Sequence, residues 1–324
     1  MHFSLLGPLS VRDDRGPVEL RGGLRRTLLA ALLLHAGTPV SVDRLTECLW
    51  GQKATDADPA RLHNQVLRLR QALADGGERI RAVPPGYLIH VEPGELDLHV
   101  FTEEHAAGRL ELADKEWAEA ARRFAAALEL WRGRPLADIS ALADDPRIRE
   151  LEETHLQTLQ GRIEAELNLS RHHELLGELR ALTEEHPRHE AFRSQLMLAL
   201  YRAGRHADAA AAYDAYQDSL ADELGLEPST ELRELHAAIV RQDPALSPPR
   251  KPNAPRQLPA DTRTFTGRSA ELAELVAAAG EASGALVISA LDGMAGIGKT
   301  ALAVHTAHRI ADRFPDGQDR KSVV

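Results

Sequence analysis

The proline-rich segment at residues 244–259 is the feature that most constrains how this chain folds. Six of its sixteen residues are proline, in the run PALSPPRKPNAPRQLP. Proline has no backbone N–H to donate and restricts the preceding residue, so a segment of this kind favours an extended tether over helix or strand. We therefore expect residues 244–264 to be a linker, with separately folded parts before and after it.

The composition excludes several classes of protein. Apolar residues make up 43% of the 324 residues and charged residues 27%, as in soluble globular chains. Cys48 is the single cysteine, so neither an intramolecular disulfide nor a multi-thiolate metal site can form. The longest apolar run, residues 28–34, is far shorter than the ~20 residues that span a bilayer, and the N-terminus lacks the pattern of a signal peptide. We expect a cytoplasmic protein without membrane contact.

The net charge of −10 is distributed unevenly along the chain. Residues 1–91 carry 12 Lys and Arg against 9 Asp and Glu, a net charge of +3. Residues 92–244 carry 17 against 32, a net charge of −15, and residues 245–324 carry 10 against 8, a net charge of +2. The acidity therefore belongs to the middle part. The first part keeps the sign that attracts phosphates, so a nucleic-acid contact is expected there.

Residues 98–243 have helical patterns almost throughout and contain an internal repeat. The triplet AEL at residues 165–167 is matched 34 residues later by ALY, and each triplet is followed by Arg-His after the same interval. This spacing is the period of tetratricopeptide helix pairs, which predicts a short solenoid of stacked helices. A generic helical bundle is the alternative. Both interpretations make this part a surface for other proteins.

Residues 1–97 combine short strands and three helices in the order of a winged helix-turn-helix domain. The expected elements are an N-terminal hairpin over residues 3–11 and 18–20, helices over residues 24–36, 41–50 and 59–73, and a closing hairpin over residues 80–91. Ser41 and Asp58 are the expected N-caps of the second and third helices, and Pro59 suits a first helical position. The whole chain is thus predicted to be mainly α, with an incomplete α/β segment after the linker.

The third helix carries the residues expected to read DNA. Its apolar stripe consists of Leu62, Val66, Leu69 and Leu73, and the opposite face carries Arg61, Asn64, Arg68 and Gln71. Arginine can donate two hydrogen bonds to guanine or to phosphate, and Asn and Gln can pair with adenine in the major groove. A merely solvated face is the alternative. Additional basic residues at the start of the first helix favour DNA contact, namely Arg21, Arg25 and Arg26.

Four runs closely resemble the OmpR-type DNA-binding domain of the Streptomyces antibiotic regulatory proteins: GPLSV, RRTLLAALLLHAGTPVSVDRLTECLWG, RLHNQVLRLRQAL and PPGYLIHV. Residues 98–243, with the run LADELGLEPSTELRELHAAIV, resemble the bacterial transcriptional activation domain that follows it in that family. The resemblance implies a transcriptional activator that binds direct repeats in double-stranded promoter DNA and recruits RNA polymerase through sigma factor. It also implies control of secondary-metabolite (antibiotic) biosynthesis genes, and leaves open a homodimer on DNA.

The resemblance further implies roles for single residues. In the run RLRQAL, Arg68 and Arg70 occupy positions that commonly contact DNA in OmpR-type domains. The turn at residues 83–87 departs from the family pattern, because it has no basic residue where such wings often carry one. Only Arg79 and Arg81 lie near enough in sequence to replace it, and Arg81 is retained as a candidate DNA contact.

Beyond the linker, the run GMAGIGKT matches the Walker A pattern for cradling phosphate, with Gly293, Gly298, Lys299 and Thr300 at the defining positions. An expected buried strand at residues 286–291 precedes it and an expected helix follows from Lys299. The sequence ends ten residues after Phe314, before any Walker B strand. We therefore expect residues 265–324 to be the N-terminal fragment of an NB-ARC-like P-loop NTPase domain, with weak ATP or ADP binding at most and no required cofactor.

The remaining sequence offers no recognisable catalytic triad and no metal-ligand spacing among its histidines. We therefore expect no enzymatic activity and no metal. Two alternatives to a DNA-binding activator stay open. One is a signalling P-loop NTPase regulated through its N-terminal domain, and the other is a tetratricopeptide adaptor whose winged helix binds protein.

Overall fold

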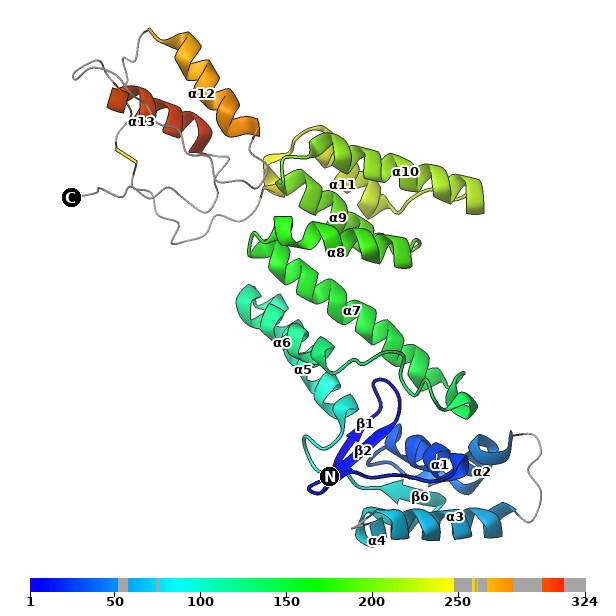
Figure 1. Cartoon of the computed structure of the whole chain (residues 1–324). Coiled ribbons are helices and arrows are strands. Elements are labelled where there is room, and N and C mark those ends of the chain that lie inside the picture. The colour runs from blue at the N-terminus through cyan, green and yellow to red at the C-terminus, as the bar shows by residue number, and fades with distance from the viewer. Residues whose placement is uncertain are drawn as a thin grey trace, which may run out of the picture. The chain divides into compact units, whose positions relative to one another are not determined.

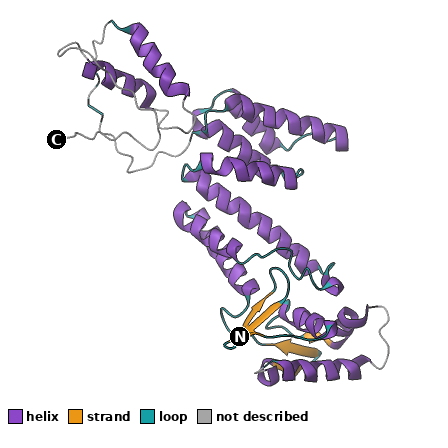
Figure 2. Ribbon diagram, viewed as in Figure 1, coloured by secondary structure: helices purple, strands orange, loops and turns teal. Residues whose placement is uncertain are grey.

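The computed structural model describes residues 1–51, 58–73, 76–247, 258–259, 261, 267–281 and 299–311. The chain forms two compact units, Met1–Leu246 and Ser247–Val324. Helices are the main secondary structure of the described residues, and the strands belong to the first unit (Figure 2). Within the described part, no helix combines the length and the apolar character that a membrane crossing requires.

The first unit begins with a small antiparallel sheet. Its strands are β1 (His2–Ser4), β2 (Ser10–Asp13) and β3 (Gly16–Pro17), paired in that order. Buried Phe3 lies opposite buried Val11, which confirms the predicted N-terminal hairpin. The expected strand at residues 18–20 is wrong in its bounds: the third strand is β3 at residues 16–17, and the Val18 amide adds a 2.9 Å hydrogen bond to the Val11 carbonyl before Leu20 enters the core.

The winged helix follows this sheet. It consists of helices α1 (Gly23–Leu33), α2 (Val42–Trp50), α3 (Asp58–Ala72) and α4 (Gly76–Arg79), and of strands β4 (Val40–Ser41), β5 (Ile80–Val83) and β6 (Gly86–Ile89). The predicted order of three helices and a closing hairpin is confirmed, and the short α4 is an addition. The Ser41 side chain accepts the Arg44 amide at 3.2 Å, as expected for an N-cap.

Two local features shape this domain. Helix α1 ends at Leu33, earlier than predicted, because Gly37 at φ 79° turns the chain and donates its amide to the Ile89 carbonyl at 3.0 Å. Strand β6 lies between β4 and β5 in the second sheet. Gly86 sits so close to β4 that a Cβ there would overlap the Val40 carbonyl oxygen. Glycine at this position lets the wing pair with β4.

Helices make up the rest of the first unit (Figure 1). They are α5 (Asp97–Ala113), α6 (Trp117–Glu129), α7 (Pro146–Asn168), α8 (His172–Glu185), α9 (Glu190–Arg202), α10 (His206–Leu224) and α11 (Thr230–Val240), with short 3₁₀ turns at Ser140–Leu142 and Pro244–Leu246. Consecutive helices pack against one another, α5 on α6, α6 on α7, α8 on α9 and α9 on α10. The repeated Arg-His pairs mark the starts of α8 and α10. The tetratricopeptide assignment itself stays a prediction.

The aromatic ring of Phe124 fixes the spacing of α5, α6 and α7. It is fully buried, and it touches Gly108 of α5 and Gly161 of α7. A Cβ at Gly108 would lie 2.8 Å from this ring, and one at Gly161 would lie 2.6 Å from it. Side chains at these two positions would therefore force the three helices apart.

One hydrophobic core runs from the winged helix into the helices behind it. Leu5 and Leu28 of the winged helix belong to the same buried cluster as Phe101, Leu136 and Ile148. The pattern break at residues 92–97 is a turn in the chain, with Gly94 at φ 79°, and the core continues across it. The winged helix and the helices behind it are therefore held together by packing on both sides of this turn.

The second unit is described mainly by two helices. These are α12 (Ser269–Glu281) and α13 (Lys299–Ile310), which pack against each other. His305 Nδ1 lies 2.9 Å from an Asp261 carboxylate oxygen. The predicted strand at residues 286–291 and most of the glycine-rich run lie outside the described residues. Helix α13 begins at Lys299, where the sequence predicts a helix.

Candidate nucleic-acid interface

Helix α3 buries one side and exposes the other. Leu62 and Leu69 are fully buried, and Val66 and Leu73 are almost so, where α3 packs on α1 and α2. The polar residues predicted for the opposite face are all exposed, namely Arg61, Asn64, Arg68 and Gln71. The predicted arrangement of the two faces is thus observed. Such a face on the third helix of a winged helix suits insertion into a major groove.

Leu67 and His63 are also exposed on α3, and the sequence reasoning did not single them out. Leu67 is 46% exposed, and it follows Asn64 and precedes Gln71 by about one helical turn. His63 is exposed, with its Nδ1 3.4 Å from the hydroxyl of Tyr87 in the wing. A signal for Leu67 was present, because this apolar residue falls outside the buried stripe. We use "reading face" for Arg61, His63, Asn64, Leu67, Arg68 and Gln71.

Arg70 has a different environment from Arg68. Its Nε and Nη2 donate hydrogen bonds of 2.9 and 2.6 Å to the Ile80 carbonyl oxygen at the start of β5. The side chain is half-buried, so it joins α3 to the wing instead of standing on the reading face. The DNA contact implied for Arg70 by the family resemblance stays a prediction.

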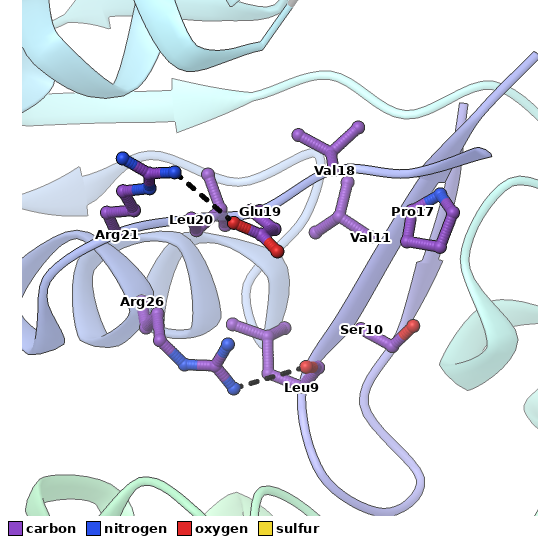
Figure 3. A pocket seen from close by; sticks show the side chains of 9 residues that line it. All are labelled: Leu9, Ser10, Val11, Pro17, Val18, Glu19, Leu20, Arg21 and Arg26. Carbon is purple, nitrogen blue, oxygen red and sulfur yellow. Dashed lines mark hydrogen bonds and ion pairs between the residues drawn. The ribbon is translucent and has the colours of Figure 1, made fainter. Parts of the chain in front are cut away.

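The three arginines before and within α1 also differ from one another. Arg21 is exposed and lies 3.7 Å from exposed Glu19, a pairing that contributes little in water. Arg25 is half-buried beside Gly22. Arg26 donates to the Leu9 carbonyl at 3.2 Å and forms an ion pair with Asp138, as Figure 3 shows for Leu9. Packing of the helical part thus brings Asp138 onto the guanidinium of Arg26, and the DNA contact predicted for Arg26 stays a prediction.

A shallow pocket of about 340 Å³ lies beside Arg21 and Arg26 (Figure 3). Its walls are mostly apolar, with Leu9, Val11 and Val18 among the lining residues. The two arginines reach its rim from the segment before α1 and from α1 itself. Because Arg26 is already paired with Asp138, Arg21 is the cation of this region whose side chain stays in solvent.

The wing turn at residues 83–87 has no charged side chain. Of the two arginines that could replace the missing basic residue, Arg79 is largely buried. Arg79 Nη2 donates to Glu95 at 2.7 Å, and both side chains are 12% exposed. Burial alone would raise the pKa of Glu95, but the hydrogen bonds from Arg79 and the N-terminal amine lower it to about 2. Arg79 is therefore not available as a wing contact. Arg81 is exposed, with its Nε bonded to the Glu78 carbonyl at 3.0 Å, and it remains the candidate cation of the wing.

Other polar contacts hold the winged helix against the helical part. The buried Asp97 carboxylate accepts the Leu5 amide at 2.8 Å and the Leu6 amide at 3.1 Å. Burial raises the pKa of Asp97, although these amide hydrogen bonds oppose the shift. Asp145 caps α7 and pairs with Arg44 of α2 at 2.9 Å. We use "junction" for the contacts made by Arg26, Arg44, Arg79, Glu95, Asp97, Asp138 and Asp145.

The four residues predicted to bind nucleotide lie at the start of α13 or just before it. Gly293 and Gly298 lie outside the described residues. Lys299 and Thr300 open α13, where Thr300 is exposed. Among the residues that are described, no three His, Cys, Asp or Glu side chains come together in a way that could hold a metal ion.

Two family profiles match the chain. "Transcriptional regulatory protein, C terminal" matches residues 20–89, the region of α1 to β6. "Bacterial transcriptional activator domain" matches residues 96–240, the region of α5 to α11. The first match contains the reading face, and the second contains the carboxylates that the helical part brings to the junction, including Asp138 and Asp145.

Several proteins are similar to this chain. Regulatory protein AfsR of Streptomyces griseus is 38% identical over 329 residues, 98% of this chain and 33% of AfsR. The chain therefore spans about a third of that relative. Regulatory protein DnrI of Streptomyces peucetius is 34% identical over 76% of this chain and 94% of DnrI. The solved structure of Mycobacterium tuberculosis EmbR in complex with a low-affinity phosphopeptide matches with a TM-score of 0.72 and 35% identity, over 75% of this chain and 65% of that one.

Proposed function

The chain belongs to the Streptomyces antibiotic regulatory protein family of transcriptional regulators, and from this premise we propose that it is a sequence-specific DNA-binding activator. The observation that carries the proposal is the exposed, polar reading face of α3, opposite a fully buried stripe. Within a winged helix, the third helix is the element that enters the major groove of DNA.

The residues of the reading face suit readout of base edges. Asn64 and Gln71 can each form paired hydrogen bonds with adenine, and Arg68 can do so with guanine or bind a phosphate. Arg21 and Arg81, exposed at the edges of the domain, supply charge for phosphates. The uncharged wing turn then approaches the DNA without a basic side chain at its tip.

The helical part supplies the activating surface. The net charge of −15 over residues 92–244 repels DNA phosphates, which leaves this surface to protein partners. The junction holds it in one orientation relative to the reading helix. We propose that it recruits RNA polymerase through sigma factor, with the protein bound to direct repeats near a promoter. The genes controlled are those of antibiotic or other secondary-metabolite biosynthesis, and a homodimer on DNA is compatible with such repeats.

The proposal includes no catalytic step. Every residue assigned to DNA binding lies in the first unit, and the Walker A run lies in the second. We therefore propose that DNA binding by this chain requires no nucleotide, even if ATP or ADP binds weakly at Lys299 and Thr300. An activator of promoters in a bacterium works in the cytoplasm.

Selection of preferred duplexes from a random pool, followed by gel-shift titration, tests the proposal. Arg68→Ala should weaken binding of the selected site by ~1–3 kcal/mol, about 5-fold to 150-fold, without loss of folded structure. Arg180→Ala is the matched control, because Arg180 is an exposed arginine of α8. If the pool yields no enriched sequence, or if both variants bind like the wild type, the DNA-reading role is wrong.

The salt dependence of DNA binding and the turnover of ATP distinguish a DNA-binding activator from a protein-binding adaptor and from a signalling NTPase. Binding through several arginines must fall steeply as salt rises, whereas an adaptor that binds protein shows no DNA affinity to lose. ATP turnover that disappears in Lys299→Ala would favour the signalling NTPase. Footprinting upstream of the neighbouring genes, with and without RNA polymerase, would then show whether the bound protein extends the polymerase contact.

A further inference from the structure

We propose that Leu67 reads the methyl group of a thymine in the major groove and thereby determines part of the sequence preference of this protein. The inference deepens the proposed function and depends on it. The reading face is the site concerned, and the chemistry is an apolar contact in the middle of polar residues.

Leu67 is the more exposed of two exposed leucines among the described residues of the winged helix, the other being Leu24 of α1 at 38%. The leucines of the α3 stripe are at most 2% exposed, and Leu67 is 46% exposed. A single exposed leucine on a protein surface needs no explanation in general. Here, however, the exposure falls on the one helix that the domain offers to DNA.

The position of Leu67 ties it to the polar readers. It lies three residues after Asn64 and four before Gln71, the two spacings at which side chains are neighbours on a helix surface. A docked position that brings the amides of Asn64 and Gln71 to base edges therefore brings Leu67 into the same groove. Leu67 will contact whatever the DNA presents between those bases.

The chemistry of the groove selects one partner for this side chain. Thymine is the one base of unmodified DNA with an apolar group, its C5 methyl, at the major-groove edge. Leucine can neither donate nor accept a hydrogen bond, so it would leave the amine of a cytosine without its water partner. Contact with Leu67 thus favours thymine and disfavours cytosine at one position. Neighbouring Asn64 and Gln71 favour adenine, so the centre of the site should be rich in A·T pairs.

The test removes one methyl group from the DNA and the leucine from the protein. The full chain is first used to select its preferred duplex, and each thymine of that duplex is then replaced singly by deoxyuridine, which lacks only the methyl. For the wild type, one replacement should weaken binding by about fourfold, the effect expected for a buried methyl group. In Leu67→Ala the same replacement should have no effect.

Leu110→Ala is the control, because Leu110 of α5 is also exposed, at 69%, but lies outside the winged helix. This variant should keep the methyl sensitivity, and the salt dependence of all three proteins should agree, since no phosphate contact is removed. If no thymine is sensitive, or if the sensitivity persists in Leu67→Ala, the inference is wrong while DNA binding stands. If no duplex is selected at all, the proposed function fails instead. Thermal unfolding should show the three proteins equally folded.

Discussion

Arginine side chains serve different purposes in the reading face and in the junction. On the reading face, Arg68 extends into solvent beside Asn64 and Gln71. In the junction, Arg26 and Arg79 pair with carboxylates that the helical part or the turn before it supplies. The same residue type, in the same small domain, is therefore either a candidate ligand for DNA or a structural link. Acidic partners from distant parts of the chain decide which.

Removing the helical part from the winged helix should have the largest effect, because it removes the junction and part of the shared core. A fragment of residues 1–97 loses Leu136, Ile139 and Ile148 from its core and loses Asp138 as the partner of Arg26. Each missing large apolar side chain costs ~2–5 kcal/mol, so the fragment should be unfolded or several kcal/mol less stable than residues 1–246. Urea unfolding followed by circular dichroism compares the two. Equal midpoints would mean that the shared core adds nothing to the winged helix.

Replacing one arginine of each region by alanine should separate an effect on DNA affinity from an effect on stability. Arg68→Ala should cost ~1–3 kcal/mol of DNA binding and nothing in stability. Arg26→Ala should cost about 1 kcal/mol of stability, because its ion pair with Asp138 is partly exposed, and should leave the salt slope of DNA binding unchanged. Gel shifts and thermal unfolding of both variants measure the two effects. A smaller salt slope of DNA binding in Arg26→Ala would show that Arg26 contacts DNA.

Acid should weaken the ion pair of Arg79 and Glu95 in the junction. The pKa of Glu95 is about 2 in the folded protein, below its ordinary value of 4.5, so its contribution to stability is present above pH 4.5 and is lost as the pH falls toward 2. Allowing for solvent screening, the contribution is about 1–2 kcal/mol. Urea unfolding from pH 6 down to pH 3 should show this slope, and Glu95→Gln should flatten it. An unchanged slope in the variant would contradict the assignment.

The smallest effect is expected in the second unit. Lys299→Ala should leave DNA binding unchanged, because the reading face and the junction consist of residues from Met1–Leu246. Gel-shift titrations with and without ATP measure this, with Arg68→Ala as the variant that must respond. A nucleotide-dependent affinity that Lys299→Ala abolishes would show that the second unit controls the first.

Local patterns in the sequence were enough to predict the main elements of the winged helix. The spacing of Leu62, Val66 and Leu69 placed the buried stripe of α3, and Ser41 marked the start of α2. These features depend on residues within a few positions of one another, through helical periodicity and a cap hydrogen bond. The composition likewise separated the acidic helical part from the winged helix. The same periodicity also predicts that Leu67 is exposed, because Leu67 lies outside the buried stripe of α3.

The roles of the arginines could not be read in this way. Arg26 and its partner Asp138 are 112 residues apart in sequence, and Arg79 and Glu95 are 16 apart. Arg70 turns to the Ile80 carbonyl because α3 and β5 meet in the folded domain. A guanidinium carries the same charge in all these places, and only the carboxylates and carbonyls that packing brings within hydrogen-bond distance distinguish them. The sequence by itself thus determined which helix presents a polar face, whereas the tertiary structure decided which cations remain in solvent as candidates for DNA contact.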